Sequence, residues 1–344
     1  MIILNYNGTS DTLACIKSIE KYEDLSRITV FLLDNASQEE QTAKLDDSLK
    51  DHERLIFNGS LAEAQHFGEW KSGIALIHSS ENFGFAKGNN ACMRIAVEAG
   101  YQYCLLMNND TELTDSSISK MVALQDASDE YAALSTVIAY WSNPEVLWNA
   151  GGKMFFGTRK YYLNKAVDRW KRDKRKVVTV DFLTGCFLLL RSSLLKEYGF
   201  LSEDFFFGEE DYEFSLRYAK HKLKMGVLVD TTLLHKVGQS IKKADGMGVL
   251  SKQFVHHLNR MIDMKRQYSY PMWFIWRLIT AGYIWLGLFR KKTGIRGCNV
   301  FIRNLLRFSG VFNGVSQGLF LWVLDHDMTT LIESEEIERI RQNL

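Results

Sequence analysis

Proline is almost absent from the chain, and the usual signatures of disulfide-rich and zinc-binding proteins are missing as well. Only 2 of the 344 residues are proline, which excludes a proline-rich linker between mobile modules. The five cysteines are odd in number, widely spaced and form no C-x-x-C, so neither a disulfide scaffold nor a zinc ribbon is expected. This cysteine usage is typical of the reducing cytoplasm.

A large net charge is also lacking. The 42 Lys and Arg residues nearly balance the 41 Asp and Glu residues, leaving +1. This balance argues against a nucleic-acid binder, which is usually basic overall. With 46% apolar and 24% charged residues, the composition is typical of a globular protein, and the length corresponds to about two domains.

Short apolar runs recur through the first 110 residues, and each ends in a polar, turn-forming group. Apolar residues at helical spacing lie between them. Continuous apolar strands that alternate with helices predict an α/β fold whose mainly parallel sheet is buried on both faces. Ligands of such sheets bind at the carboxyl ends of the strands. The runs lie at 2–4, 28–33, 75–77 and 103–107.

Residues 131–240 contain further expected strands, at 178–183, 186–190 and 225–229. Within this stretch, residues 164–176 carry seven basic and two acidic side chains. A charge run of this kind favours a solvated loop over a loop that binds an anionic ligand.

The stretch 264–324 contains nine Lys and Arg residues and no Asp or Glu, whereas the rest of the chain has 33 basic against 41 acidic residues. Within it, residues 272–289 carry one charge, Arg277, and six aromatic side chains. At about 1.5 Å per residue, such a helix is only marginally long enough to span a bilayer. Aromatic and basic residues together favour association with the membrane–water interface, ahead of a buried core helix and of a true span.

Three side chains that can bind ligands follow expected strands. Asp34 and Asp110 come at strand ends, where a carboxylate can accept from ribose or base or bind a divalent cation. Each alone is more typical of a turn or cap, but two on one sheet edge, with amides beside them, favour a site. His235 precedes Gly238-Gln-Ser240 and is placed where it could contact a metal or a diphosphate.

The loop Glu81-Asn-Phe-Gly-Phe-Ala-Lys-Gly-Asn-Asn90 has glycines at 84 and 88 and leads into a predicted helix over 91–99. A glycine-containing loop at a helix start can present backbone N–H groups to phosphate. The loop is neither a G-x-G-x-x-G motif nor a P-loop, so by itself it favours a structural turn.

Four carboxylates, on Glu209, Glu210, Asp211 and Glu213, stand at the start of a helix expected to run through Arg217. Acidic side chains stabilise helix N-termini, and Glu213 can pair with Arg217 at i,i+4. That account leaves unexplained the three phenylalanines at 205–207, directly before the acids. Aromatic rings exclude water around a carboxylate, as a general base requires.

Taken together and in order, these motifs resemble those of the family 2 inverting nucleotide-sugar glycosyltransferases of GT-A fold. The resemblance is greatest to the bacterial rhamnosyltransferase-like enzymes of surface-polysaccharide assembly, and it covers about residues 1–240. The eight matching motifs are Ile3-Leu-Asn-Tyr-Asn-Gly8, Leu33-Asp-Asn-Ala-Ser37, Asn82-Phe-Gly-Phe-Ala-Lys-Gly-Asn-Asn90, Leu106-Met-Asn-Asn-Asp110, Trp148-Asn-Ala-Gly-Gly152, Phe182-Leu-Thr-Gly-Cys186, Phe206-Phe-Gly-Glu-Glu-Asp211 and His235-x-x-Gly-x-Ser240.

The resemblance implies a GT-A catalytic domain over 1–245, with a nucleotide-sugar half at 1–110 and an acceptor half at 111–245. A helical, basic and aromatic-rich region would follow over 246–344. Asp211 would be the catalytic base, and Asp110 with His235 would hold Mg²⁺ or Mn²⁺. The implied donor-binding residues are Asn5, Asp34, Asn82, Gly84, Phe85, Asn89 and Asn109. The implied sugar and acceptor residues are Trp148, Thr184, Gly185 and Glu210.

The implied reaction is inverting transfer from dTDP-rhamnose or a UDP-hexose to a hydroxyl of a saccharide acceptor, lipid-linked in many such enzymes. It would serve bacterial capsule, O-antigen or cell-wall polysaccharide synthesis, with residues 264–324 on the inner face of the plasma membrane. A homodimer is left open, as is a native start upstream of Met1. Asn108 stands where the family's D-x-D motif has its first acid, so a single carboxylate would carry the metal.

Two other functions compete with this interpretation. A sugar-phosphate nucleotidyltransferase shares a nucleotide-binding α/β half and metal carboxylates, but it needs neither the aromatic and acidic cluster before Asp211 nor an acid-free C-terminal stretch. A non-catalytic, membrane-docked nucleotide-sugar scaffold would not need the four candidate side chains of Asp34, Asp110, Asp211 and His235 together.

Overall fold

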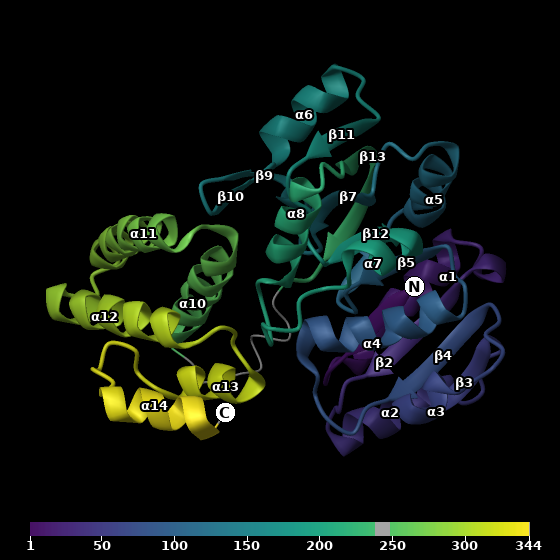
Figure 1. The fold of residues 1–344 in the computed structure, drawn as a ribbon. Coiled ribbons are helices and arrows are strands. Elements are labelled where there is room, and N and C mark those ends of the chain that lie inside the picture. The colour runs from purple at the N-terminus through teal and green to yellow at the C-terminus, as the bar shows by residue number, and fades with distance from the viewer. Residues whose placement is uncertain (238–247, 344) are drawn as a thin grey trace. The chain divides into compact units, whose positions relative to one another are not determined.

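The computed structural model describes residues 1–237 and 248–343 (Figure 1). These residues form two compact units. The first contains residues 1–201 and the chain from 211 onward to 237, and the second contains residues 202–210 together with the C-terminal helices. The nine residues before Asp211 therefore group with the C-terminal helices, although the sequence pattern places them in the catalytic half.

The first unit is built on an 11-stranded mixed sheet. Five neighbouring strands, from β3 to β5 in the sheet order, are parallel, and β12 is antiparallel to both of its neighbours. The predicted α/β fold with a mainly parallel sheet is thereby confirmed. The order across the sheet is β3 (Leu55–Ser60), β4 (Gly73–His78), β2 (Thr29–Asp34), β1 (Ile2–Asn5), β5 (Tyr103–Met107), β12 (Phe187–Arg191), β7 (Ala133–Tyr140), β13 (Met225–His235) and β11 (Val177–Val180); β6 (Thr111–Leu113) pairs with β13, and β8 (Asn143–Asn149) with β7.

Helices cover both faces of this sheet, which is why its strands are continuous apolar runs. Successive residues of one strand point to opposite faces, so Ile2 joins the core beneath one set of helices and Ile3 the core beneath the other. On the Ile3 side lie α1 (Thr9–Tyr22), α2 (Glu39–Leu49) and α5 (Ser117–Ala127). On the Ile2 side lie α4 (Gly84–Glu98), α7 (Ser192–Tyr198) and α8 (Glu210–Lys220).

The parallel register aligns the polar side chains that end the strands. Asn5 of β1 lies opposite Asp34 of β2, and Asp34 lies opposite His78 of β4. Because these strands run the same way, their last residues gather at one edge, as the sequence pattern predicts. Residues 108–110 follow β5 at the same edge.

The basic segment over 164–176 is not the expected loop. Residues Asn164–Arg172 form the helix α6, and the prediction of a loop is wrong there. Val167 and Trp170, three positions apart, are buried on one side of this helix, while its charged residues stay exposed. An apolar stripe at helical spacing explains the helix, and the abundance of charge conceals that stripe in the sequence. Before α6, a hairpin is formed by β9 (Gly152–Phe155) and β10 (Thr158–Tyr161).

The second unit is helical, as predicted. Its core is aromatic: the ring of Phe254 lies 5.2 Å from that of Phe301 and 5.5 Å from that of Phe308. Pro271 occupies the first turn of its helix, where a missing N–H costs no helical hydrogen bond. The helices that the structure describes after residue 247 are α10 (Val249–Gln267), α11 (Tyr270–Arg290), α12 (Ile295–Val311), α13 (Gln317–Asp325) and α14 (Ser334–Asn343).

Of the helices in the described part of the chain, α11 alone is long and apolar enough to cross a membrane by length and composition. Only 28% of its apolar window is buried. Length and composition are weak evidence for a span, since core helices pass the same test.

Candidate active site

Asp34, at the end of β2, is buried and held by three hydroxyl or amide donors. Asn5 Nδ2 donates to its Oδ1 at 2.8 Å, Thr42 Oγ1 donates to its Oδ2 at 2.7 Å, and Ser37 Oγ donates to Oδ1 as well. Asn5 is itself fixed, because its Oδ1 accepts from Thr12 Oγ1 at 2.9 Å. The carboxylate is thus oriented by the fold, with Asn5 as the link to neighbouring β1.

The start of α4 is joined to the end of β2 by Asn35, a residue that the sequence analysis included only as part of a motif. Asn35 Nδ2 donates to Asn82 Oδ1 at 3.0 Å, and its Oδ1 accepts from the backbone N–H of Phe83 at 2.9 Å. Gly84 follows with a φ of +69°, a conformation that favours glycine, and donates its N–H to Asn82 Oδ1. The structure therefore brings the predicted donor residues Asn82 and Gly84 beside Asp34.

Two further positions of the same loop lie within α4. Gly88 packs against β1, where an added Cβ would lie 3.1 Å from Leu4 Cδ1, so this glycine allows close contact between helix and strand. Asn89 is buried, and its Nδ2 donates to the backbone oxygen of Phe85 at 2.9 Å. Its expected role toward the donor stays a prediction.

The predicted metal residues Asp110 and His235 are in direct contact. Asp110 Oδ1 lies 3.1 Å from His235 Nε2, and both side chains are largely buried. Strand pairing brings them together, since Thr111 of β6 is in register with His235 of β13. Asn109 connects this pair to Asn5 at the end of β1, because its Nδ2 donates to Thr12 Oγ1 at 2.9 Å and approaches Asn5 Oδ1 at 3.5 Å.

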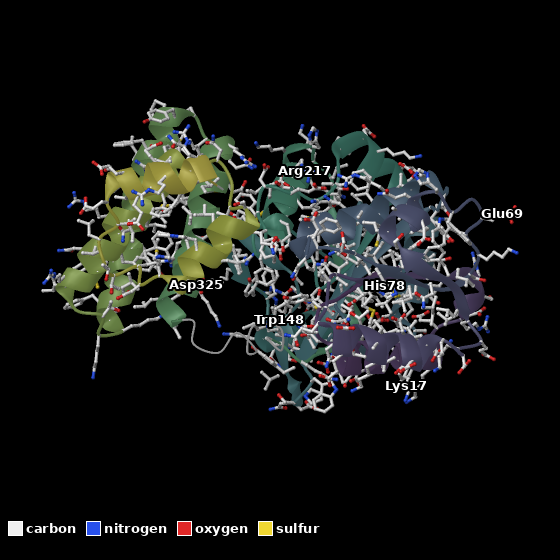
Figure 2. The ribbon with its side chains drawn as sticks, turned by 90° about the horizontal axis from the view of Figure 1, so that it is seen from below. Lys17, Glu69, His78, Trp148, Arg217 and Asp325 are labelled. Carbon is white, nitrogen blue, oxygen red and sulfur yellow. The ribbon has the colours of Figure 1, made fainter. Side chains whose placement is uncertain are left out.

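The proton on His235 is held by its surroundings. Burial by itself lowers the pKa of the imidazole, but its interactions with Cys186 and Asp110 outweigh it and raise the pKa to about 10. The Cys186 Sγ lies 3.6 Å from His235 Nδ1, and burial raises the pKa of that thiol. Trp148 of β8, labelled in Figure 2, packs edge-on against the imidazole with ring centroids 4.6 Å apart.

Asp110 and His235 are two side chains that could hold a divalent cation together with waters and substrate phosphate oxygens. Within residues 1–237 and 248–343, no three His, Cys, Asp or Glu side chains gather into a metal site. Mg²⁺ commonly binds through one or two carboxylates while keeping waters and taking substrate phosphate oxygens, so the Asp110 carboxylate could serve as the protein ligand of such an ion. Gly238 and Ser240 of the last predicted motif lie outside the described residues.

Asp211, the predicted base, stands in the first turn of α8 and pairs with Arg159 of β10. Arg159 Nη1 lies 3.1 Å from Asp211 Oδ1, and each side chain is 16% exposed. The guanidinium lies against the rings of Phe182 and Tyr212, with centroids 4.8 and 5.9 Å away. Arg159 was not predicted, because it is 52 positions from Asp211 and no motif contains it.

A turn over 184–186 connects the metal pair to the predicted base. Cys186 contacts His235, and the neighbouring Gly185 faces Asp211: an added Cβ would lie 3.0 Å from the Phe85 ring and 3.9 Å from Asp211 Cβ. Thr184 is buried at the start of this turn and accepts from the backbone N–H of Cys186. The fold thus brings the predicted Phe85, Gly185 and Asp211 together.

The acids and phenylalanines before Asp211 belong to the second unit. Glu210 folds back, and its Oε2 accepts from the backbone N–H groups of Gly208 at 2.7 Å and Glu209 at 2.9 Å. Phe206 packs against Phe320 with ring centroids 5.2 Å apart. The aromatic neighbours that the first unit supplies beside Arg159 and Asp211 are therefore different residues from the expected run at 205–207. The acceptor role implied for Glu210 stays a prediction.

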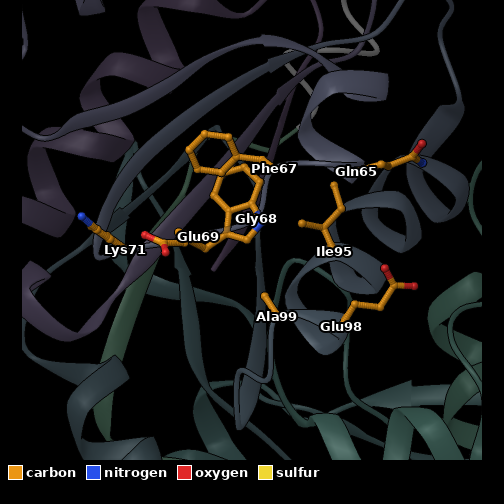
Figure 3. A pocket seen from close by; sticks show the side chains of 9 residues that line it. Gln65, Phe67, Gly68, Glu69, Lys71, Ile95, Glu98 and Ala99 are labelled. Atoms are coloured by element: carbon orange, nitrogen blue, oxygen red, sulfur yellow. The ribbon is translucent and has the colours of Figure 1, made fainter.

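A surface pocket of about 490 Å³ lies elsewhere in the first unit (Figure 3). Phe67, Trp70 and Lys71 line it just before β4 begins, and Glu98 and Ala99 line it where α4 ends. Strand starts and the end of α4 mark the edge of the sheet opposite to Asp34 and Asp110. The pocket is therefore separate from the candidate active site.

A mainly parallel sheet with amide and acidic side chains along its carboxyl edge, and an aspartate–histidine pair beside them, defines a nucleotide-sugar glycosyltransferase of GT-A fold. The family model "Glycosyl transferase family 2" matches residues 1–199, more than half of the chain. The chain belongs to glycosyl transferase family 2. A search of curated proteins gave no match.

Three solved structures share this fold. The mannosyltransferase PcManGT from Pyrobaculum calidifontis, in complex with GDP-Man and Mn²⁺, has a TM-score of 0.52 and 12% identity, over 91% of this chain and 85% of that one. S. aureus TarS 1-349 in complex with UDP-GlcNAc has a TM-score of 0.50 and 13% identity, over 99% of this chain and 86% of that one. GalNAc-T7 with UDP, GalNAc and Mn²⁺ has a TM-score of 0.51 and 17% identity, over 68% of this chain. The match spans 43% of GalNAc-T7. At these identities the likeness establishes the fold.

Proposed function

We propose that this glycosyltransferase moves a sugar, with inversion, from a nucleoside-diphosphate sugar to a hydroxyl of a saccharide acceptor. One observation carries the proposal: a continuous set of contacts runs from Asp34 through Asn5 and Asn109 to the Asp110–His235 pair. The turn at 184–186 contacts His235 through Cys186 and passes close to Asp211 at Gly185. Nucleoside, diphosphate and acceptor groups thereby have neighbouring places along one sheet edge.

Donor binding follows from the chemistry of these places. The nucleoside lies by Asp34 and the Asn82–Phe85 loop, whose helix start also presents backbone N–H groups to the diphosphate. Asp110 and His235 are the residues that would hold Mg²⁺ or Mn²⁺. Such an ion, when bound, neutralises the charge that develops on the departing diphosphate.

Asp211 supplies the base. Its carboxylate accepts the proton of the acceptor hydroxyl while the hydroxyl oxygen forms a bond to the anomeric carbon. The bond from that carbon to the diphosphate oxygen breaks on the opposite face, so the configuration inverts. Arg159 holds one carboxylate oxygen of Asp211, which fixes the direction in which the base points. Trp148, Thr184 and Gly185 shape the sugar and acceptor positions.

Resemblance favours dTDP-rhamnose as the donor, followed by a UDP-hexose. A thermal-shift series with dTDP, UDP and GDP, each with Mn²⁺, tests the proposal, because a ligand that binds only the folded state raises the melting temperature. We expect the largest shift with dTDP. Absence of a shift with all three nucleotides would contradict nucleotide-sugar binding. Release of pyrophosphate from a nucleoside triphosphate and a sugar phosphate would instead favour the nucleotidyltransferase alternative.

The outer face of α11 supports a second partner, an anionic membrane surface that presents a lipid-linked acceptor in bacterial polysaccharide synthesis. Ile275, Ile279 and Tyr283 lie on this face and are 60%, 57% and 77% exposed. Residues 290–292 add three adjacent cations at the end of the helix. Each Lys or Arg near an anionic leaflet contributes about 1 kcal/mol, so the apolar face and the cations act together. The enzyme would then act at the inner face of the plasma membrane.

The Ile275→Ser, Ile279→Ser variant should bind more weakly to vesicles that contain anionic lipid, because two exposed apolar contacts are lost. Flotation of protein with vesicles measures this binding. High salt should weaken the binding of the wild type as well, because it screens the attraction between the cations and the anionic lipid. The Phe67→Ser, Val146→Ser variant is a matched control, since both residues are exposed apolar side chains of the first unit. Equal loss in the control, or no loss in the α11 variant, would contradict the assignment of this face.

A further inference from the structure

The nine residues that precede the proposed base, here called the strap (residues 202–210), pack with the C-terminal helices. The chain leaves the first unit after Leu201 and returns to it at Asp211. We infer that the C-terminal helical unit positions Asp211 through this strap, and that Asn259 and Arg260 of α10 are positioning residues for the transfer reaction. The inference rests on the proposed role of Asp211 as the base.

The strap is attached to the helical unit through its backbone. The N–H of Val315 donates to the oxygen of Asp204 at 2.7 Å, and the N–H of Phe206 donates to the oxygen of Val315 at 2.8 Å. Gly314 fits beneath this contact, because an added Cβ would lie 2.6 Å from the oxygen of Asp204. Arg266 adds an ion pair to Asp204 at 2.6 Å. These contacts set the register of the strap on the helices.

Two adjacent residues of α10 hold the end of the strap closest to Asp211. Asn259 Nδ2 donates to the backbone oxygen of Phe207 at 2.9 Å. Arg260 pairs with Glu209 through Nε and Nη2, and Glu209 is fully buried. The held residues are therefore four and two positions before Asp211.

Stability alone does not account for the Arg260–Glu209 pair. Burying two charges costs several kcal/mol each by desolvation, and apolar residues of similar size usually stabilise a protein about as well. What the pair adds is direction, because the planar guanidinium fixes the orientation of the carboxylate it binds. A buried, directional contact two residues before a catalytic carboxylate is suited to fixing where that carboxylate lies.

Position matters strongly for a base. A displacement of about 1 Å can cost about 100-fold in rate. On its other side, Asp211 is held by α8, where Ser215 Oγ donates to its backbone oxygen at 2.7 Å. The donor residues Asp34 and Asp110 lie on or after strands of the first unit and have no covalent neighbour in the strap. Loosening the strap should therefore slow the chemical step and leave donor binding unchanged.

Asn259→Ala is the first test, with Asn304→Ala as its matched control. Asn304 is also a buried asparagine of the helical unit, and its Nδ2 donates to the backbone oxygens of Met328 at 3.1 Å and Thr330 at 2.8 Å. We expect Asn259→Ala to lower kcat about 10-fold or more while the KM for donor changes less than twofold, by the same positional argument. Asn304→Ala should lower Tm at least as much, because the Oδ1 of Asn304 also accepts from the backbone N–H of Ile332, and should keep kcat near the wild-type value.

Arg260 is tested in a way that separates folding from positioning. Arg260→Met removes the cation that pairs with buried Glu209, so the double variant Glu209→Met, Arg260→Met is compared with it to remove both charges at once. We expect the double variant to fold and still have a low kcat, and Arg260→Lys to recover part of the activity that Arg260→Met loses. A double variant with wild-type kcat, or Asn259→Ala indistinguishable from Asn304→Ala, would overturn the inference.

The same variants separate a failure of the strap inference from a failure of the proposed function. If the wild-type enzyme turns over donor and the α10 variants behave like the control, the inference about the strap falls and the proposed function stands. If the wild type neither hydrolyses nor transfers sugar from any nucleoside-diphosphate sugar tested, the proposed function falls and the inference falls with it.

Discussion

The Asp211→Asn variant is expected to bind a nucleoside diphosphate as the wild type does and to transfer sugar about a thousand-fold more slowly, within the range typical for loss of a general base. The amide is nearly isosteric with the carboxylate, so the first turn of α8 should remain intact. It cannot take the proton of the acceptor hydroxyl, and it loses the charge that pairs with Arg159. Steady-state transfer assays together with nucleotide titrations measure the two effects separately.

Asp181→Asn is the control for this change. Asp181 is an exposed carboxylate of the same unit that accepts from the backbone N–H of Met154 in β9 at 3.1 Å. We expect transfer by Asp181→Asn to stay within about twofold of the wild type, as for most surface substitutions. Near-normal transfer by Asp211→Asn would remove Asp211 from the role of base.

The second large effect concerns the metal. Removal of divalent ions with EDTA should lower transfer about 100-fold or more, since electrostatic stabilisation of a leaving group contributes several kcal/mol. Excess Mn²⁺ or Mg²⁺ should restore it. Asp110→Asn should reduce transfer similarly and require a higher metal concentration, because a carboxylate ligand is lost. Isothermal titration of Mn²⁺ in the presence of the nucleotide measures the affinity directly.

The pH dependence of metal binding has a definite sign. The surroundings of His235 raise its pKa to about 10 against the effect of burial. A histidine must lose its proton to bind a metal, so affinity for Mn²⁺ should rise with pH over the range below that value. Glu112→Gln, which alters a carboxylate paired with Lys236 at 3.1 Å, is the control near Asp110. Full activity in EDTA would contradict the metal assignment.

The fold could be predicted from local patterns because its strands are buried on both faces. The runs 28–33 and 103–107 are apolar apart from Thr29, and the structure shows helices on both sides of them. The strand over Leu55–Ser60 escaped prediction, since it lies at the edge of the sheet and half of its residues are exposed or polar. The helix α6 was not predicted, because only two of its side chains are buried and the others are mostly charged.

The candidate site was only partly predictable, for a related reason. Asp34, Asp110 and His235 follow strands, and strand ends are visible in a sequence. Arg159 lies 52 positions from Asp211, in a hairpin without a motif, and only the folded chain brings the two within 3.1 Å. Asn35 was visible as part of a motif, but its role in joining β2 to α4 required the hydrogen bonds.

By itself, the sequence of this protein determined the α/β fold, the edge of the sheet that carries the candidate site residues, and the helical, acid-free C-terminal stretch. Each of these features has a local pattern in the sequence: apolar residues at regular spacing, or turn-forming residues at strand ends. Tertiary structure alone decided which polar side chains touch, and that residues 202–210 pack with the C-terminal helices. Such contacts join residues distant in the chain, and no local pattern encodes which pairs will meet.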